Sequence, residues 1–154
     1  MAVLYAVVTI LLIAADQIVK TWAAAALAGT DGINAVPHVL KFVYVENRGI
    51  AFGMFQNLQP VLVPLSIAIM IACIVLAVSC HKKKKTFAVW SLLLVVAGAA
   101  GNIIDKVMHG YVVDFICTTF IDFPVFNLAD IFICVGAALF AVYILFFDKE
   151  EQTK

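Results

Sequence analysis

The chain has 154 residues, of which 65% are hydrophobic and only 13% are charged, and its mean hydropathy is +1.09. A soluble domain carries roughly one quarter charged residues, so this composition is typical of a membrane protein. Ten basic residues balance ten acidic ones, and the formal net charge is zero. This balance argues against a nucleic-acid partner, because no broad basic face can form. The length predicts one membrane domain, residues 1–154.

Four apolar segments follow one another along the chain, and each is predicted to form a membrane-spanning helix. Such a helix needs about 20 mostly apolar residues to cross a hydrocarbon core of roughly 30 Å. The first segment reaches this length only if the helix continues through Asp16 and Lys20. A signal peptide is the alternative for it, but no positive residue precedes its apolar core, and a small-residue tract continues the helix. The predicted helices span residues of about 3–27, 60–80, 87–108 and 126–147.

A lysine-rich loop between the second and third helices indicates the orientation. The sequence HKKKKT, residues 81–86, is short and strongly basic, which is typical of a cytoplasmic loop. Lys149 and Lys154 follow the fourth helix and fall on the same side if there are four spans. We therefore expect a multi-pass protein with both termini in the cytoplasm, and with residues 28–59 and 109–126 on the outer side.

The first outer segment is predicted to contain β structure at about residues 38–56. The sequence LKFVYVENRGIAFGMF, residues 40–55, has β-branched and aromatic residues in partial alternation and contains Asn47-Arg48-Gly49. This pattern favours short strands bent around a turn. The expected fold is an all-α integral membrane protein of four transmembrane helices, with a small β-sheet or cradle on the outer, periplasmic face.

The third predicted helix contains the small-residue stretch AGAAG, residues 97–101. Small residues let helices in lipid approach closely, so this stretch predicts a packing face that brings the next turn toward a neighbour. That turn carries Asn102, Asp105 and Lys106 on one helical face. Asp105 and Lys106 have a simpler alternative, because charges are common at helix ends.

Ionisable residues inside membrane spans usually face the interior of a bundle or a wet cavity and indicate a functional site. Asp16 and Lys20 lie four residues apart with the acid first, which is the favoured order for an ion pair on a helix. A purely structural pair is an equally good interpretation, since a partner is the usual solution for a charge in lipid.

Two aspartates in apolar surroundings are the main candidates for chemistry. Asp114 follows the predicted helix end at Gly110, and Asp130 lies in the first turns of the fourth helix, three residues after Asn127. A turn at Phe123-Pro124 links them, so we expect them at the same level of the membrane and within a few ångströms of each other. Two carboxyl groups this close in an apolar site hold one proton between them, which suits them to activate water for amide hydrolysis.

Two neighbouring acids have simpler interpretations. Asp130 can also be a carboxylate that is tolerated at a helix start, where the helix dipole favours it. Asp122 lies in the loop, can reach water, and is given no role.

The cysteines and histidines do not follow a metal-binding pattern. The four cysteines form no CxxC pair and no cluster with histidine, so a zinc site is not expected. We expect no metal and no cofactor.

Four stretches of the chain resemble the lipoprotein signal peptidases (signal peptidase II), which are aspartyl proteases of the bacterial inner membrane. The stretches appear in the family's order and spacing, and the resemblance covers essentially the whole chain. They are DQIVK at 16–20, ENRGIAFGMF at 46–55, GNIIDKVMHGYVVDFI at 101–116 and FPVFNLADIFICVGAAL at 123–139.

The resemblance implies a substrate and a set of site residues. The family cleaves diacylglyceryl-modified prolipoproteins just before the lipidated cysteine, and its two catalytic aspartates correspond to Asp114 and Asp130. The implied partners are these lipid-modified precursors and membrane lipids, and we expect a monomer. The implied supporting or substrate-binding residues are Asp16, Lys20, Asn47, Gly49, Asn102, Asp105 and Asn127.

One residue departs from the family pattern. Lys106 stands where the family usually has arginine. Lysine keeps the positive charge but lacks the planar, multi-donor group of arginine.

Two other classes of protein compete with this interpretation. A small transporter or channel subunit also uses membrane carboxylates, but it predicts acids near the bilayer midplane rather than at the outer ends of the helices. A structural assembly subunit uses polar residues for helix pairing, but it does not explain why they gather toward one side of the membrane.

Overall fold

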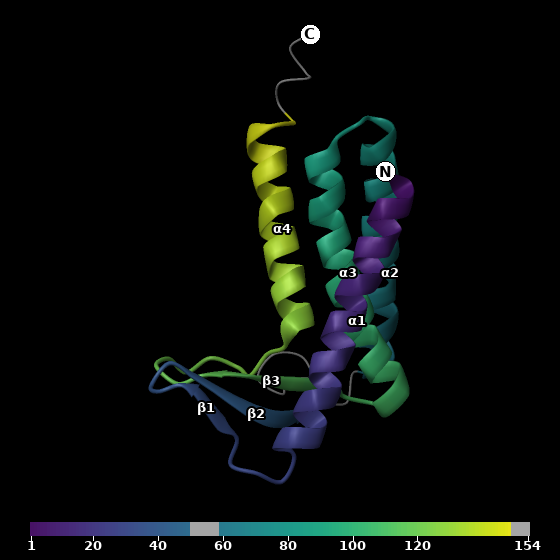
Figure 1. Ribbon diagram of the computed structural model, residues 1–154. Helices are drawn as coiled ribbons and strands as arrows, with labels where there is room; N and C mark the ends of the chain where they lie inside the picture. The colour runs from purple at the N-terminus through teal and green to yellow at the C-terminus, as the bar shows by residue number, and fades with distance from the viewer. Residues whose placement is uncertain (50–58, 149–154) are drawn as a thin grey trace.

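The computed structural model describes residues 1–49 and 59–148 of the chain. In this part of the chain, four long helices stand side by side, and a three-stranded sheet lies across one of their ends (Figure 1). The N-terminus and the end of the last helix lie at the opposite end. The prediction of a four-helix membrane protein with a small sheet at one end is therefore confirmed.

The helices are α1 (Ala2–Leu27), α2 (Gln59–Lys82), α3 (Thr86–His109) and α4 (Leu128–Phe146). Each is long and apolar enough to cross a membrane. α3 packs against the other three helices. Large apolar side chains elsewhere on the helices are exposed, such as Ile10, Ile69 and Val142, and this suits a surface that faces lipid.

Glycines on α3 let its neighbours approach closely. A Cβ atom added at Gly98 would collide with the backbone oxygen of Ala129, and one added at Gly101 would collide with the carboxylate of Asp16. The packing role predicted for the AGAAG stretch is confirmed, because it brings both α4 and α1 against α3 at the level of the next turn.

Local sequence signals define the ends of α3 and α4. α3 ends at Gly110, which has φ of 77° in the left-handed region and donates its N–H to the backbone oxygen of Lys106. Glycine adopts this conformation without a steric penalty, so it is the usual residue after a helix. α4 begins after Asn127, whose side chain accepts the N–H of Asp130, while the Asp130 carboxylate accepts the N–H of Asn127. This reciprocal capping box fixes where the helix starts.

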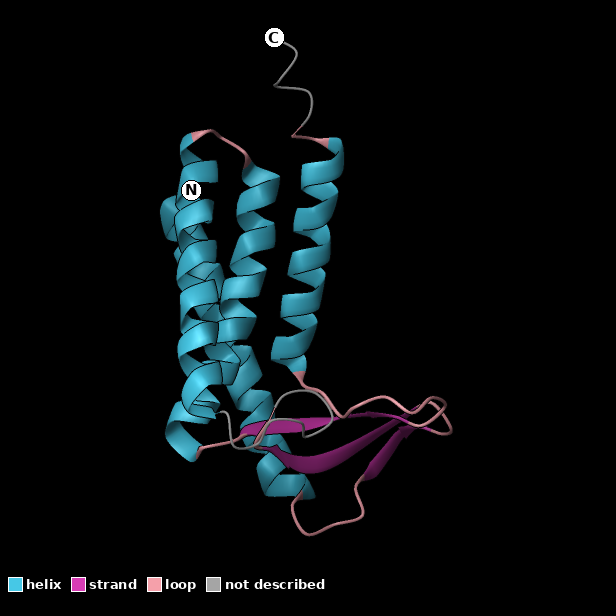
Figure 2. Ribbon diagram, turned by 180° about the vertical axis from the view of Figure 1, so that it is seen from behind, coloured by secondary structure: helices cyan, strands magenta, loops and turns pink. Residues whose placement is uncertain are grey.

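The sheet contains three antiparallel strands in the order β1 (Ile33–Val36), β2 (Leu40–Asn47) and β3 (Val112–Thr118), seen in Figure 2. β2 and β3 are far apart in the sequence but pair directly, with Val45 opposite Asp114 and Asn47 opposite Val112. The sheet therefore joins the outer segment after α1 to the segment between α3 and α4.

Two features of the sheet differ from the sequence-based prediction. The strand predicted before Asn47-Arg48-Gly49 is present as β2, which ends at Asn47, but its partners are β1 and β3. The strand predicted after the turn falls at residues 50–58, which lie outside the described part. The segment 109–126, treated as a loop, contains β3. Its residues Val112, Val113 and Phe115 are β-branched or aromatic and suit a strand, and burial of Val113 and Phe115 against α1 stabilises the strand there.

The sheet packs on the end of α1 through an apolar core. Ala23 and Leu27 of α1 are buried against Val113 and Phe115 of β3. Trp22 of α1 adds an edge-to-face ring contact with a β2 phenylalanine. After β3 the chain turns back, and Ile116 and Phe126 exchange backbone hydrogen bonds of 2.8 and 3.1 Å. This turn returns the chain to the start of α4 and places Asp130 near Asp114.

Candidate active site

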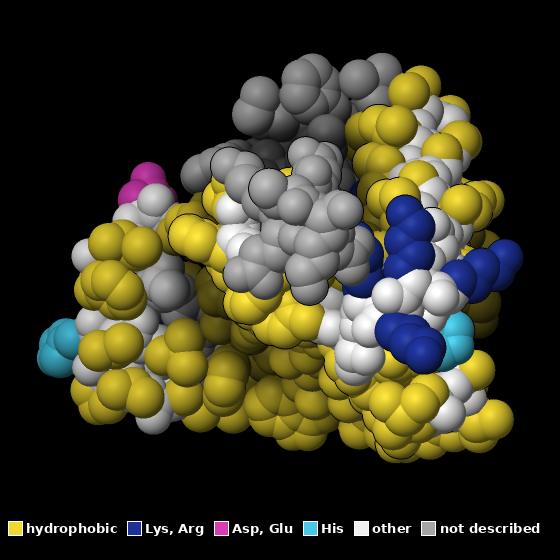
Figure 3. Space-filling view, turned by 90° about the horizontal axis from the view of Figure 1, so that it is seen from above, with side chains coloured by type: hydrophobic (Ala, Val, Ile, Leu, Met, Phe, Trp, Pro, Cys, Tyr) yellow, Lys and Arg dark blue, Asp and Glu magenta, His cyan; other side chains and the backbone are white. Residues whose placement is uncertain are grey.

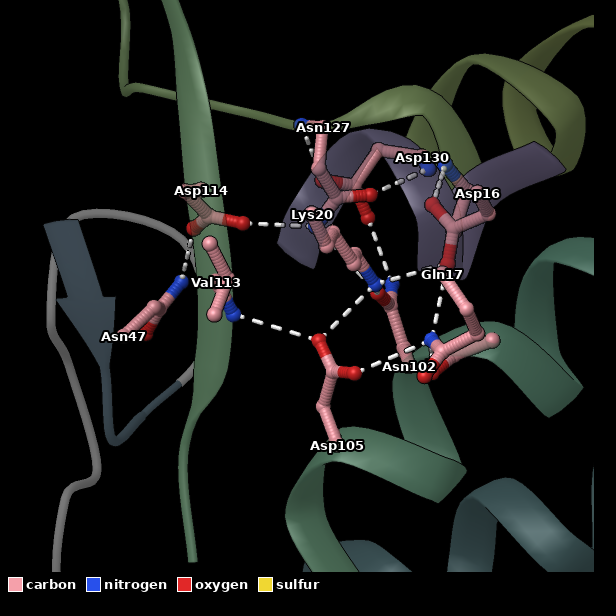
Figure 4. Close-up of polar contacts among 12 residues, drawn as sticks. Asp16, Gln17, Lys20, Asn47, Asn102, Asp105, Val113, Asp114, Asn127 and Asp130 are labelled. Atoms are coloured by element: carbon pink, nitrogen blue, oxygen red, sulfur yellow. Dashed lines mark hydrogen bonds and ion pairs between the residues drawn. The ribbon is translucent and has the colours of Figure 1, made fainter. Parts of the chain in front are cut away.

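The polar residues predicted from the sequence gather at the sheet end of the helices (Figure 4). They come from α1, the end of β2, α3, β3 and the start of α4, which are segments spread over the whole chain. The residues that hydrogen bonds or ion pairs join there are Asp16, Lys20, Asn47, Asn102, Asp105, Asp114, Asn127 and Asp130. Gly49 joins them through its backbone N–H, which donates to Oδ1 of Asn47 at 3.0 Å.

Asp114 lies on β3 and is 2% exposed. Its two carboxylate oxygens accept hydrogen bonds from two different amides: Nδ2 of Asn47 at 2.8 Å and Nδ2 of Asn127 at 2.6 Å. Burial raises the pKa of the Asp114 carboxyl from its ordinary value of 3.8 to about 6, and the neighbouring charge of Asp130 raises it further, while the amide hydrogen bonds oppose the shift. Asp114 can therefore change its protonation state near neutral pH.

Asp130 lies in the first turn of α4 and also accepts with both oxygens. Oδ1 accepts from Nδ2 of Asn102 at 2.8 Å, and Oδ2 accepts from the backbone N–H of Asn127 at 3.1 Å. The simpler interpretation, an acid at a helix start, is thus also correct, because Asp130 completes the capping box of α4. The same carboxylate lines the cavity described below, so capping does not remove it from the site.

Two asparagine amides connect Asp114 to Asp130. Asn127 is fully buried; its Nδ2 atom donates to Asp114, and its Oδ1 atom accepts the backbone N–H of Asp130 at 3.0 Å. Asn102 donates to Asp130 and accepts from Nδ2 of Asn127 at 3.2 Å. The described contacts thus bring the two carboxyl groups together through a bridge of amides, and a proton shared between them stays a prediction.

Three charged residues form a buried cluster beside this bridge. Nζ of Lys20 lies 3.0 Å from Oδ2 of Asp16 and 3.0 Å from Oδ2 of Asp105, and it donates to Oδ1 of Asn102 at 2.8 Å. The side chains are at most 3% exposed. The ion pair predicted between Asp16 and Lys20 is present, and Asp105 joins it rather than lying at an exposed helix end.

A cavity of about 580 Å³ opens beside both aspartates. Its polar wall contains Asp114, Asp130 and Lys106, and most of its remaining wall is apolar. Lys106 interacts electrostatically with both carboxylates. The residues that line the cavity are Asn47, Gly49, Asn102, Lys106, Val112, Asp114, Phe123, Pro124, Val125, Phe126, Asp130, Ile131, Cys134 and Val135.

Sequence reasoning missed one polar member of the site. The Nε2 atom of Gln17 lies 3.0 Å from Oδ1 of Asp105, 3.2 Å from Oδ2 of Asp16 and 3.1 Å from the backbone oxygen of Gly101. Its signal was a polar amide within the apolar first helix, immediately after Asp16. Asp122, to which no role was given, is exposed and does not line the cavity.

This arrangement suits proton transfer to and from a group held in the cavity. Two carboxyl groups face one mostly apolar space, and the pKa of Asp114 lies near the pH at which a side chain can act as a base. A carboxylate pair in such a setting can take a proton from water and give one to a substrate oxygen or nitrogen.

Comparisons with known proteins agree with one another. Residues 8–146 match the family model described as signal peptidase (SPase) II. The chain is similar to the lipoprotein signal peptidase of Clostridioides difficile (strain 630), with 36% identity over 97% of this chain and 99% of the relative. It is also similar to the lipoprotein signal peptidase of Streptococcus thermophilus (strain CNRZ 1066), with 40% identity over 92% of this chain and 90% of the relative.

Solved structures give the same result for the fold. A bacterial membrane enzyme structure determined by the in meso method at 2.3 Å resolution has 31% identity and a TM-score of 0.81, covering 92% of this chain and 87% of that one. A second, at 1.9 Å, has 31% identity and a TM-score of 0.79, covering 94% and 93% of the two chains.

Proposed function

Because this chain belongs to the signal peptidase II family, and is therefore a membrane protease that removes signal peptides from prolipoproteins, we propose that it works as an aspartic endopeptidase with Asp114 and Asp130 as its catalytic pair. The observation that carries the proposal is the cavity that both carboxyl groups line, with one bridge of amides joining them. No cofactor is required for this chemistry.

The proposed reaction is attack of water on the scissile carbonyl. The ionised carboxyl of the pair takes a proton from water, and the resulting hydroxide adds to the carbonyl carbon. The protonated carboxyl gives its proton to the carbonyl oxygen, and the tetrahedral intermediate then releases the amine after a proton transfer to nitrogen. The raised pKa of Asp114 supports this division of roles, since one protonated and one ionised carboxyl are needed at the same pH.

The proposed substrate is a diacylglyceryl-modified prolipoprotein, cleaved just before the lipidated cysteine. The cavity suits such a substrate because its polar wall is confined to a few groups and the rest is apolar. A peptide can meet the carboxyl groups there while the acyl chains stay in the bilayer beside the exposed apolar faces of the helices. All of these groups belong to one chain, so a monomer is sufficient to bind and cleave this substrate.

We propose that the protein lies in the bacterial inner membrane with both termini in the cytoplasm and the sheet outside. Lysine side chains gather on one side of the end opposite the sheet (Figure 3), where Lys82, Lys83 and Lys84 are exposed. Basic residues of short loops stay in the cytoplasm, which supports this orientation. The site then lies on the outer side, where exported precursors arrive.

The test is cleavage of a lipid-modified precursor by the purified protein in liposomes. Asp114→Asn and Asp130→Asn are each expected to reduce the rate at least about 10³-fold, because each removes one half of the proton transfer. Asp122→Asn is the matched control: the same change at an exposed aspartate, with the parent rate expected.

Folding is measured beside activity in the same preparations. Asp114→Asn places an amide against the two amides that now donate to it, so each variant is compared with the parent by size-exclusion chromatography and thermal unfolding. Substantial cleavage by a folded Asp114→Asn or Asp130→Asn variant would contradict the two-carboxyl mechanism.

A further inference from the structure

The residue immediately before each proposed catalytic aspartate is held by a buried carboxylate. The backbone N–H of Val113 donates to Oδ2 of Asp105 at 3.2 Å, and the backbone N–H of Ala129 donates to Oδ1 of Asp16 at 2.9 Å. The donor at Ala129 is not needed for regular secondary structure. Ala129 lies in the first turn of α4, where N–H groups have no acceptor within the helix.

The two carboxylates are joined to each other by Lys20. Its ammonium group contacts Asp16 and Asp105 at 3.0 Å each and donates its third hydrogen bond to Asn102 at 2.8 Å. An ammonium group has three N–H donors, so all of them are used. Asn102 in turn donates to the carboxylate of Asp130.

Gln17 ties the same two carboxylates together from the other side. Its amide lies within hydrogen-bond distance of Asp16 and Asp105 and also of the backbone oxygen of Gly101 on α3. Glycine leaves room for this contact, because a Cβ atom at position 101 would collide with the Asp16 carboxylate and displace it. α1 therefore presents one connected set of groups to α3, β3 and α4.

We propose that Asp16, Gln17, Lys20 and Asp105 form a positioning frame that sets the separation of the two catalytic aspartates by holding the backbone next to each one. This inference rests on the proposed function of Asp114 and Asp130. The frame acts through the peptide units of residues 113 and 129, so its members are positioning residues and do not contact the substrate. It connects the strand that carries one acid to the helix that carries the other.

The frame combines two acids with one base, and its remaining hydrogen bonds come from neutral donors. A buried lysine with two carboxylates has one negative charge in excess, and the two backbone N–H groups and the Gln17 amide supply the remaining hydrogen bonds. Replacing one acid by its amide leaves the lysine paired with the other acid. Variants of this kind keep a matched buried ion pair, which favours folding.

The first test measures kcat and KM of Asp105→Asn and Asp16→Asn with a lipid-modified precursor in liposomes. Each variant is expected to lose about 10- to 100-fold in kcat per folded molecule, since a misplacement of about 1 Å can cost a factor of 10². KM is expected to stay within about threefold, because the frame does not line the cavity. Asp148→Asn is the matched control: it also breaks an ion pair, with Lys85 at the other end of the molecule, and is expected to keep the parent kcat.

The second test removes the held N–H groups without changing any charge. Cell-free synthesis with an α-hydroxy acid at position 129 or at position 113 converts one peptide bond to an ester, which deletes the donor and keeps the side chain. Each ester is expected to lower kcat at least about tenfold with little change in KM. Gln17→Leu, also neutral, is expected to lower kcat by a smaller factor.

Cleavage rates are compared per folded molecule, with thermal unfolding measured on the same samples. Ester and Asn variants that keep the parent kcat, even if they unfold at lower temperature, would overturn the proposal and leave the four residues a role in stability alone. If the parent cleaves and Asp114→Asn does not, the proposed function holds, and parent-like kcat values in the frame variants contradict the frame alone. A parent without cleavage would instead contradict the proposed function, and the frame would fall with it. If Asp105→Asn or Asp16→Asn does not fold, the kcat values of the ester variants test the proposal instead.

Discussion

At the scale of single residues, Asn127 shows why the site needs amides as well as acids. Its Nδ2 atom donates to Asp114, and its Oδ1 atom accepts the N–H of Asp130, so both halves of the amide are used. Aspartate caps a helix as well as asparagine does, but it would put a third carboxyl group against the pair. Serine can also cap a helix, but its shorter side chain would not reach the Asp114 carboxylate. The residue type is therefore set by the two acids together.

The orientation of Asn102 follows from similar chemistry. Lysine can only donate and an ionised carboxylate can only accept, so Oδ1 of Asn102 must face Lys20 and Nδ2 must face Asp130. The Asn102 amide therefore links the Lys20 ammonium group to the Asp130 carboxylate. This residue was predicted to matter because it lies within an apolar run, but its pairing with Lys20 depends on how α1 crosses α3.

The pKa of Asp114 predicts the alkaline side of the pH–rate profile. With a pKa of about 6, this carboxyl is protonated below that pH and ionised above it. The charge of Asp130 raises this pKa, so Asp114 is the second carboxyl of the pair to lose its proton. Because the mechanism needs one protonated and one ionised carboxyl, cleavage is expected to fall as the pH rises through about 6, and to fall again at low pH when both carboxyl groups are protonated. The profile measured in liposomes from pH 4 to 9 should be bell-shaped, with apparent values that belong to the pair.

A variant of Asn47 tests the cause of this limb. The hydrogen bond from Asn47 lowers the pKa of Asp114, so its removal in Asn47→Leu should raise that pKa and move the alkaline limb of the profile to higher pH. Asp122→Asn should leave the limb in place. If the limb of the Asn47→Leu profile lies at the same pH as in the parent, or if the parent profile is monotonic, the assignment of this limb to Asp114 is contradicted.

At the scale of elements, the sequence predicts helices better than strands. The spans follow from runs of apolar residues that are long enough to cross lipid, which is a local property. β3 is stabilised by pairing with β2 and by burial of Val113 and Phe115 on α1, and both partners are distant in sequence. The segment could therefore be called outer and apolar, but its strand and register could not be predicted from its own residues.

The start of α4 shows the same limit. The spacing of Asn127 and Asp130 predicts that both lie near a helix start, and it is also the spacing of a capping box. The sequence alone does not show that these two residues also reach Asp114 and Asn102. That depends on the turn from Ile116 to Phe126, which returns the chain beside β3.

The glycines of α3 provide a test of how the elements are assembled. The methyl group of Gly98→Ala meets the backbone of Ala129, so α4 must move away from α3, and the methyl group of Gly101→Ala meets the Asp16 carboxylate, which must leave its place. Each variant is expected to lower the unfolding temperature and to reduce cleavage at least about tenfold, because the shift reaches the aspartates.

Val107→Ile is the matched control for these glycine variants. It adds one methyl group to the same helix at a side chain that is 68% exposed, so neither stability nor cleavage should change. Parent-like cleavage by Gly98→Ala and Gly101→Ala would show that close approach at α3 is not needed for the site.

At the scale of the whole molecule, the distribution of polar groups separates the site from the rest of the bundle. The buried charges lie at the sheet end, while the exposed helix surfaces are apolar. The transporter interpretation predicted acids at mid-membrane, and the proposed catalytic pair lies instead where β3 and the start of α4 meet. Composition could predict the membrane class and the four spans. The clustering of residues from five elements required the fold, since their separations along the chain do not encode it.

The orientation of the molecule gives the last prediction. In a chain whose cysteines at 73, 80, 117 and 134 are replaced by serine or alanine, single cysteines are placed at two exposed positions: Asp31→Cys beside the sheet and Lys83→Cys in the turn between α2 and α3. Charge in the short lysine-rich turn favours the cytoplasm, so a membrane-impermeant thiol reagent should label position 31 from outside the inner membrane and position 83 only after that membrane is permeabilised. The reverse labelling pattern would place the aspartates on the cytoplasmic side. It would contradict the proposed path of the substrate, which reaches the site after export to the outer side.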